Sequence, residues 1–184
     1  MTELSDEKIA EAIQSGEAEA FGEIISRYEL KLKRYARRFL SLKEDVDDLV
    51  QDVFIKAYTN IQSFDPSLRF SPWIYRIAHN TFVNELKRKQ RVGFGVFDAD
   101  IVLPFLPAKE TSDADTLNEE LKVEMEKVID KLSPKYREVV VLHYYEELSY
   151  AEISDVLRIS VSSVGVRMTR ARQKLRELYN EENN

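Results

Sequence analysis

Apolar residues recur at helical spacing along most of this 184-residue chain. They repeat three or four residues apart in the segments 21–39, 43–61 and 71–91, and a shorter pattern ahead of these begins after Ser5 and stops at Gly16. A serine before the first helical residue and a glycine just past the last one are usual helix boundaries. We therefore expect four helices in the first half of the chain.

Two Ser-Pro pairs predict where helices start, because proline is favoured at the first helical position after a capping serine. Ser71-Pro72 is expected to begin the helix at 71–91, and Ser133-Pro134 a helix with Val139, Val140 and Leu142 facing inward. With five glycines and five prolines in the whole sequence, the pattern predicts an all-α fold.

The helical pattern is interrupted at residues 92–116. This segment contains two glycines and two prolines and has no helical period. A structureless connection of about 25 residues is too long for the inside of a compact domain, so we predict a linker between domains at 1–91 and 117–184. The linker is rich in apolar residues, which indicates that it lies in a groove of another molecule.

Residues 148–176 are predicted to form two helices around a tight turn. Ser149 and Glu152 have the spacing of a capping box at the start of the first helix. Ser160 is expected to cap the second, whose outward face then holds Ser162, Ser163, Val166, Thr169, Arg170 and Gln173. This is the layout of a helix-turn-helix that reads a DNA major groove. The alternative is an antiparallel helix pair with a solvated basic face.

The net charge of −6 is unevenly distributed. Residues 64–91 carry six basic and two acidic side chains, and residues 158–176 carry six basic and no acidic ones. The rest of the chain is acidic and would be repelled by DNA at moderate salt. We expect a protein that contacts DNA through two separate basic regions and binds it poorly without help.

Composition narrows the class of protein further. The absence of cysteine excludes disulfides and thiolate metal sites and suits a reducing cytoplasm. No apolar run approaches the roughly 20 residues of a membrane span, so we expect a cytoplasmic protein without membrane insertion. His79 and His143 lack the spacing of metal ligands, and no phosphate loop or nucleophile motif occurs. We expect no metal, no cofactor and no catalysis.

One face of the helix at 71–91 combines an aromatic ring, amides and cations. On a helical projection it collects Trp73, Arg76, Asn80, Val83, Asn84, Lys87 and Arg91. Cations suit phosphates, asparagine pairs with base edges, and an exposed tryptophan stacks on unpaired bases. We expect this face to bind single-stranded or distorted DNA, with the loop at 63–70 closing a pocket around a flipped base. The alternative is that Trp73 belongs to the core and the polar groups are only solvated.

An acidic face lies on the helix at 43–61. Its residues Asp47, Asp48, Gln51 and Asp52 cannot face DNA phosphates. A solvated surface is the usual interpretation of such a face, metal binding is weakly supported, and a basic protein partner remains an alternative.

These features together resemble the bacterial extracytoplasmic-function (ECF) sigma factors of RNA polymerase. The resemblance covers nearly the whole chain and rests on three segments in the family's order and spacing. They are DVDDLVQDVFIKAYTNIQSFD at 45–65, FSPWIYRIAHNTFVNELKRKQR at 70–91, and LSPKYREVVVLHYYEELSYAEISDVLRISVSSVGVRMTRARQKLREL at 132–178.

The resemblance implies a transcription initiation factor with two helical domains, sigma two at 1–91 and sigma four at 117–184. Its partners would be RNA polymerase core (the clamp helices and flap), promoter DNA and an anti-sigma factor. The acidic face would dock on the clamp helices, and the linker would enter the RNA exit path. The minus-ten element would be melted and bound by Trp73, Arg76, Asn80, Asn84, Lys87, Arg88 and Arg91.

The same resemblance assigns the minus-thirty-five element to Ser162, Ser163, Val166, Arg167, Thr169 and Arg170. The recognition helix departs from the family pattern, in which Thr-Val-Lys/Arg-Ser-Arg is common, because this chain has Ser-Val-Gly-Val-Arg at 163–167. Glycine inside a helix costs about 1 kcal/mol relative to alanine, so we expect Gly165 to serve close approach to DNA. Val166 is suited to packing on a thymine methyl, which predicts an altered minus-thirty-five preference.

Two other functions remain as alternatives to a sigma factor. A self-sufficient helix-turn-helix repressor or response regulator would bind duplex DNA tightly without polymerase, which the acidic charge disfavours. A helical-bundle enzyme with a DNA-binding appendage lacks any recognisable catalytic motif.

Overall fold

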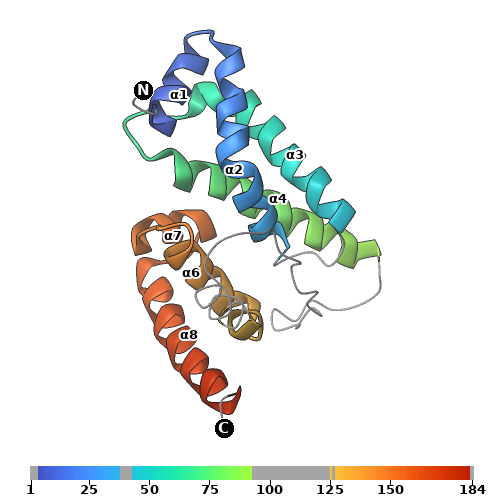
Figure 1. Ribbon diagram of the computed structural model, residues 1–184, viewed down its shortest axis with the longest axis vertical. Helices are drawn as coiled ribbons and strands as arrows, with labels where there is room; N and C mark the ends of the chain where they lie inside the picture. Colours follow the sequence, from blue (N-terminus) through green and yellow to red (C-terminus); the bar gives the residue numbers. More distant parts are fainter. Residues whose placement is uncertain (1–3, 38–42, 93–124, 126, 183–184) are drawn as a thin grey trace, which may run out of the picture. The chain divides into compact units, whose positions relative to one another are not determined.

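The computed structural model describes residues 4–37, 43–92, 125 and 127–182, and these residues contain helices, turns and no strand. The helices α1–α4 belong to one compact unit, and α6 and α8 belong to a second (Figure 1). The predicted linker at 92–116 lies outside the described residues except for Val92, the last residue of α4.

The N-terminal unit is a helical bundle. It contains α1 (Asp6–Gln14), the 3-10 helix η1 (Ala18–Ala20), α2 (Phe21–Ala36), α3 (Lys43–Asn60), the 3-10 helix η2 (Ile61–Ser63) and α4 (Phe70–Val92). As predicted, Ser5 caps α1, accepting a hydrogen bond from the backbone N of Lys8 at 3.4 Å. Gly16 follows α1 with φ +109°, a conformation that favours glycine.

Aromatic rings fill the centre of this unit. Tyr35 of α2 lies 5.4 Å from the ring of Tyr75 and 5.8 Å from that of Phe82, both on α4. Tyr28, two turns earlier on the same face of α2, lies 5.7 Å from Phe70 at the start of α4. Rings at these separations and tilts attract one another beyond the burial of their area, so they fix α4 against α2.

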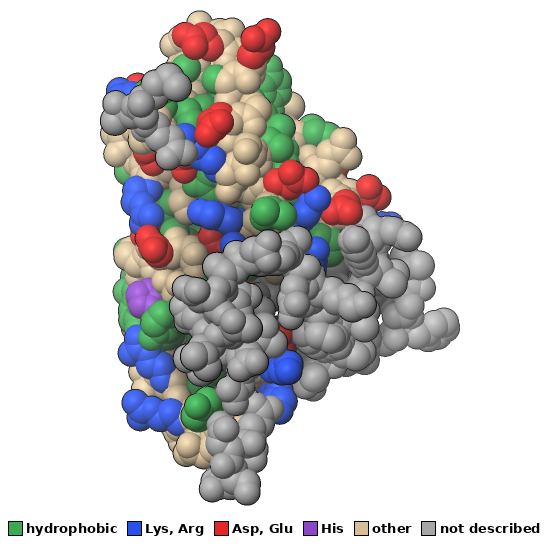
Figure 2. Space-filling view, viewed as in Figure 1, with side chains coloured by type: hydrophobic (Ala, Val, Ile, Leu, Met, Phe, Trp, Pro, Cys, Tyr) green, Lys and Arg blue, Asp and Glu red, His purple; other side chains and the backbone are tan. Residues whose placement is uncertain are grey.

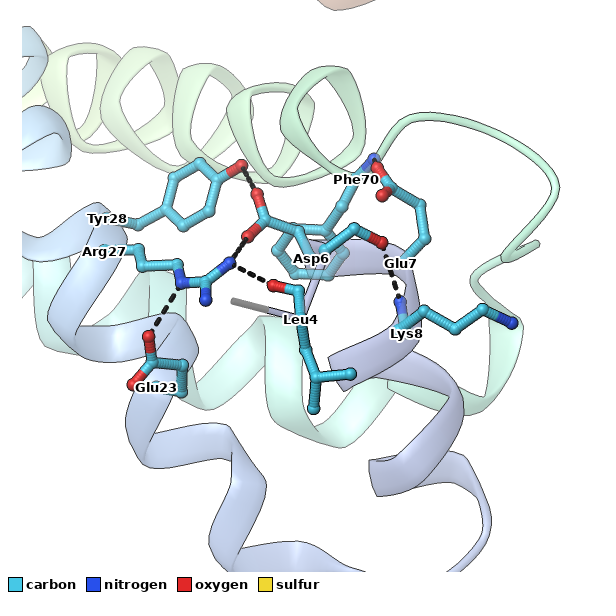
Figure 3. A network of polar contacts seen from close by, with 9 residues as sticks. Leu4, Asp6, Glu7, Lys8, Glu23, Arg27, Tyr28 and Phe70 are labelled. Atoms are coloured by element: carbon cyan, nitrogen blue, oxygen red, sulfur yellow. Dashed lines mark hydrogen bonds and ion pairs between the residues drawn. The ribbon is translucent and has the colours of Figure 1, made fainter. Parts of the chain in front are cut away.

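The start of α4 differs from the prediction. The helix begins at Phe70 rather than after a capping Ser71. The carboxylate of Glu7, on α1, accepts a hydrogen bond from the backbone N of Phe70 at 3.0 Å (Figure 3). An acceptor from another helix therefore satisfies one of the first free N–H groups of α4, and a distant residue cannot be inferred from local pattern.

The C-terminal unit carries the helix-turn-helix. The described helices in this part of the chain are a helical stretch at 127–130, α6 (Pro134–Tyr144), α7 (Tyr150–Leu157) and α8 (Val161–Glu182). The Ser133-Pro134 start of α6 and the capping box of Ser149 and Glu152 are confirmed. Arg158, between α7 and α8, has left-handed backbone angles (φ 54°, ψ 46°), which make the sharp turn of this motif.

The core of the C-terminal unit consists of the predicted apolar stripes. Val164, Met168 and Ala171 of α8 are completely buried. The other buried apolar residues come from the helices before it and include Val128, Leu132, Val139, Leu142, Ile153 and Val156. The charged side chain of Arg137 is buried here as well, and its guanidinium donates to the carbonyls of Leu132, at 2.9 Å, and Asp130. The burial of one face of α8 leaves its opposite face for contact with other molecules.

Candidate nucleic-acid interface

A pocket of about 350 Å³ opens between the end of α3 and the middle of α4. Trp73, Asn80 and Asn84, three of the residues predicted to contact the minus-ten element, line it together. Ser63, which also lines it, begins the loop at 63–70 that was expected to close a pocket. The other lining residues were not predicted as site residues and are Lys56, Asn60, Ile77 and Thr81. The volume is near the lower end of the roughly 300–1,000 Å³ typical of small-ligand pockets, and the lining is rich in hydrogen-bonding groups.

Trp73 combines features of a core residue with features of a surface that stacks on bases, the two interpretations that the sequence allowed. Its ring packs against those of Phe64 and Phe70, with 5.3 Å between centroids in each case. The side chain is half-buried and still forms part of the pocket wall. A ring that is held on one side by other aromatics and open on the other is a rigid stacking surface.

Helical projection misplaced two apolar residues of α4. Ile77 was assigned to the buried stripe, but it is half-buried and lines the pocket. Tyr75, which was not assigned to that stripe, is completely buried. The buried face of α4 is therefore rotated toward Tyr75, because α2 supplies aromatic partners there.

The residues that α3 and η2 contribute to the pocket are linked by hydrogen bonds. The Lys56 ammonium donates to the hydroxyl of Thr81 at 3.1 Å, which connects α3 to α4. Asn60 donates from its side-chain amide to the carbonyl of Lys56 at 2.7 Å, and the Ser63 hydroxyl donates to the carbonyl of Asn60 at 2.7 Å. The spacing of four and three residues is a sequence signal that all three share a face. Nothing in that spacing indicates that α4 lies opposite.

The remaining predicted minus-ten residues lie outside the pocket. Arg76 and Lys87 are exposed on α4. Arg88 is exposed as well, and its guanidinium makes two hydrogen bonds to the carboxylate of Glu85, at 2.6 and 2.7 Å. Arg91 is in the last turn of α4, with its side chain outside the described residues.

The outward face of α8 carries the residues predicted to contact the minus-thirty-five element. Ser162, Val166, Thr169 and Arg170 are exposed, and Val166 retains 51% of its accessible surface. Lys and Arg side chains are prominent on the visible surface of the C-terminal unit (blue in Figure 2). An apolar side chain exposed among cations is a contact surface for bases between phosphates.

The N-terminus of α8 holds a cluster of three serine hydroxyls. Ser160 accepts from the backbone N of Ser163 at 3.2 Å, as expected for the predicted cap. Its hydroxyl also lies 2.9 Å from that of Ser162 and 2.8 Å from that of Ser163. Further along α8 the Thr169 hydroxyl donates to the carbonyl of Gly165 at 3.0 Å, so its methyl group is the part most available to a base.

An acidic side chain is associated with the recognition helix. Burial raises the pKa of the Glu138 carboxyl of α6 to about 7, and the positive charges of Arg167 and Arg137 oppose that rise. Arg167 is half-buried on α8. The charge on Arg167 is thus partly balanced from within the protein, unlike that of the exposed Arg170.

The predicted acidic face of α3 borders an apolar groove. This groove, between α2 and α3, has a volume of about 540 Å³, and Asp47 and Gln51 are part of its lining. Asp48 and Asp52 are exposed on the same helix. Asp47 also forms an ion pair of 3.0 Å with Lys33 of α2. The hydrogen bonds that the Lys33 ammonium donates to the carboxylates of Glu29 and Asp47 raise the pKa of Lys33.

The apolar part of the groove was not anticipated from the sequence. Ile25, Ile55 and Tyr58 line it and keep 37%, 54% and 43% of their surface exposed. The ring of Tyr58 packs edge-on against Phe21 at 5.1 Å. Partly exposed apolar side chains rimmed by charges are typical of a protein-binding surface.

The described ranges hold neither a metal-binding cluster nor a membrane-spanning helix. No group of three or more His, Asp or Glu side chains there is arranged to hold a metal ion. No helix among those residues has the length and apolar character needed to cross a membrane.

Comparison with known proteins identifies the class. Residues 24–92 match the family model for Sigma-70 region 2, and residues 122–175 match that for Sigma-70, region 4. The first match covers the helices around the pocket from α2 to α4, and the second covers the helix-turn-helix. A region 2 followed by a region 4 defines a sigma factor of the sigma-70 class.

Similar proteins cover almost the whole chain. The ECF RNA polymerase sigma factor SigW of Bacillus subtilis is 34% identical, over 95% of this chain and 97% of that protein. The ECF RNA polymerase sigma-E factor of Escherichia coli is 32% identical, over 94% and 93% of the two chains. This chain belongs to the ECF sigma factors, which are transcription initiation factors that direct RNA polymerase to promoters.

Two solved structures share the fold. The structure of CnrH in complex with the cytosolic domain of CnrY is 30% identical, with a TM-score of 0.67 over 96% of this chain and 97% of CnrH. The sigma factor RpoE of Bartonella quintana, solved with the anti-sigma factor NepR, is 23% identical, with a TM-score of 0.69 over 87% of this chain and 96% of that one.

Proposed function

We propose that the α3–α4 pocket captures an unpaired base of the minus-ten element while RNA polymerase opens the promoter. The observation that carries this proposal is the lining of the pocket, in which asparagine amides, a lysine and an aromatic ring converge. An amide donates and accepts hydrogen bonds, as the edge of an unpaired base requires. Strand opening by binding needs no chemistry of the protein's own, so we propose that the chain is not an enzyme.

Each part of the pocket has a role that suits its chemistry. Trp73 supplies a stacking surface, and Asn80 and Asn84 supply hydrogen bonds to the base edge. Lys56 is suited to the phosphate beside the captured base. The exposed cations Arg76 and Lys87 extend this surface along α4, and Arg88 joins them once its pair with Glu85 opens.

The outward face of α8 is the proposed minus-thirty-five reader. Val166 packs on a thymine methyl, and Arg170 and Arg167 contact phosphates or guanine. The N-terminus of α8, with Ser162 and Ser163, is suited to a phosphate because its free N–H groups and helix dipole attract anions.

The α2–α3 surface is the proposed docking site for RNA polymerase core. Its acidic residues Asp47, Asp48 and Asp52 and the amide of Gln51 supply steering and specificity, and the apolar groove supplies the buried contact. The relative CnrH was solved bound to another protein, the cytosolic domain of CnrY. By that likeness we propose that an anti-sigma factor holds this chain inactive in the cytoplasm.

Reciprocal substitutions test the separation of these two surfaces. Asn80→Ala is expected to weaken binding of a single-stranded minus-ten oligonucleotide by about tenfold, equivalent to roughly 1.4 kcal/mol, and to leave core binding unchanged. Gln51→Ala also removes an amide, but from the face of α3 that lines the α2–α3 groove and not the pocket. It is expected to weaken core binding and to leave the oligonucleotide affinity unchanged. Fluorescence anisotropy measures both affinities. Loss of both activities in either variant would contradict the proposal.

The proposed minus-thirty-five contacts of α8 are tested by a promoter-library selection with the holoenzyme, the complex of this protein with RNA polymerase core. Val166→Ser is expected to change the preferred base at one minus-thirty-five position, because a hydroxyl replaces the surface that packs on a methyl. An unchanged preference would exclude this role for Val166. Tight footprints on duplex DNA without polymerase would instead favour a self-sufficient repressor.

A further inference from the structure

Gln14 of α1 makes hydrogen bonds to the turn that forms the rim of the α3–α4 pocket, which is the segment 61–64 with Ser63. Gln14 donates from its side-chain amide to the carbonyl of Ile61 at 2.7 Å and to that of Phe64 at 2.8 Å. These two carbonyls stand at either end of the turn that carries Ser63, a lining residue of the pocket. Gln62 in turn donates to the backbone carbonyl of Gln14 at 3.2 Å.

The same helix also holds the far end of the loop. Glu7 accepts from the backbone N of Phe70, where α4 begins. Helix α1 is fixed in its turn by an ion pair of 2.8 Å between Asp6 and Arg27 of α2 and by a hydrogen bond of 2.6 Å from the Tyr28 hydroxyl to Asp6 (Figure 3). The segment 61–70 is thus tied to α1 near both ends.

The hydrogen bonds that residues 61–67 make with one another are short-range. The carbonyl of Ile61 accepts from the backbone N of Phe64 at 3.0 Å, and the Asp65 carboxylate accepts from the backbone N of Ser67 at 3.0 Å. Short turns of this kind define their own shape but not their position relative to α4. The packing of the Phe64 ring on Trp73 contributes to that position. The bonds from Gln14 and Glu7 fix it further, because they come from a separate helix that is itself tied to α2.

We propose that Gln14 is a positioning residue for base selection at the minus-ten element. It does not belong to the pocket lining, and it acts by holding Ser63 and Asn60 at the distance from Asn80 that admits one base better than the others. This inference rests on the proposed function of the pocket. It assigns to α1, which precedes the matched region 2 segment at 24–92, a part in promoter specificity.

The test compares variants of Gln14 in the full-length chain. Gln14→Met keeps the length of the side chain and removes both donors. Lys8→Met is the matched control, because it places the same residue on an exposed position of the same helix. Each protein is titrated with minus-ten oligonucleotides that carry each of the four bases in turn at each position, and its core affinity is measured in parallel.

We expect Gln14→Met to reduce the ratio of affinities between the preferred and the other bases at one position by about fivefold, near the lower end of the discrimination that a bidentate base contact supplies. Lys8→Met should keep the wild-type ratio, and core binding should be unchanged in both variants. If Gln14→Met does not fold, Gln14→Asn replaces it, since it retains the amide but is one methylene too short to reach both carbonyls.

Three outcomes would overturn the inference. The wild-type ratio in folded Gln14 variants, or an equal loss of affinity for all four bases, would show that Gln14 does not set selection. A parallel loss of core affinity would assign it a structural role only. A wild-type protein without base preference, and insensitive to Asn80→Ala, would instead refute the proposed function of the pocket itself.

Discussion

The carboxylate of Glu7 accepts a hydrogen bond from the backbone N of Phe70, 63 residues further along the chain. This contact joins the first helix of the protein to the helix that forms one wall of the pocket. It also satisfies a free N–H group at a helix N-terminus, where negative charge is favoured.

Replacement of Glu7 by alanine is expected to lower the free energy of unfolding by about 1 kcal/mol at pH 7, the usual cost of losing a helix cap. Urea denaturation measures this change. Burial opposes ionisation of Glu7, but the hydrogen bonds from the backbone N–H groups of Phe70 and of Glu7 itself prevail and lower its pKa below the ordinary 4.5.

The depressed pKa fixes the sign of the pH effect. The unfolded chain takes up its proton at a higher pH than the folded protein, so the charge of Glu7 stabilises fully above about pH 4.5 and less as the pH falls through the folded pKa. Glu7→Gln retains a neutral acceptor, and its difference in stability from wild type should vanish at low pH. A difference that persists there would contradict this account.

Lys56→Met is expected to weaken binding of the minus-ten oligonucleotide and to make it less dependent on salt. Loss of one phosphate contact to a single strand reduces the slope of log K against log salt by roughly 0.7. Lys31→Met is the control, since Lys31 is an exposed lysine of α2 outside the pocket lining. Titrations at several salt concentrations give both slopes, and an unaltered slope for Lys56→Met would exclude a phosphate contact.

Gly165→Ala is expected to increase the stability of the protein and to weaken its binding to DNA. A Cβ at Gly165 meets no atom within 4 Å, so alanine should stabilise α8 by about 1 kcal/mol. If the glycine permits close approach to DNA, the same change should weaken binding of the holoenzyme to minus-thirty-five duplexes several-fold. Gly22→Ala is the control, because that site on α2 is equally open. Equal duplex binding by all three proteins would leave Gly165 without a role in recognition.

The difference in free energy of unfolding between Glu138→Gln and wild type is expected to grow in favour of the variant as the pH rises from about 4.5 to about 7. Over this range the folded protein keeps a proton that the unfolded chain has released, because burial raises the pKa of Glu138 to about 7. Wild type therefore loses stability across the window, by roughly 1–2 kcal/mol for a partly accessible group, and the variant does not. Urea midpoints between pH 4.5 and 8 measure the difference. A difference that stays constant over this range would contradict this assignment.

Local signals in the sequence were sufficient for the helix-turn-helix. The capping box at Ser149 and Glu152 and the cap at Ser160 both involve residues within three positions of each other. Val166 was expected on the outward face of α8 and is exposed, since helical periodicity alone decides which residues oppose a buried stripe.

The pocket was predictable only in part. Asn80 and Asn84 share a face of α4 and were identified from their spacing. Lys56 was missed, because its role depends on the hydrogen bond that it donates to Thr81 on a different helix. The apolar groove was missed for a similar reason: Ile25 and Ile55 form one surface only after α2 and α3 pack together.

The sequence by itself determined the helical class, most of the helix boundaries, the two basic regions and the membership of the sigma-factor family, since these depend on periodicity, capping and motif order. Tertiary structure alone decided how α3 meets α4 to form a pocket and how Glu7 and Gln14 hold its rim. Contacts between residues about 50 or more positions apart leave no local pattern, because their geometry exists only after the helices have packed.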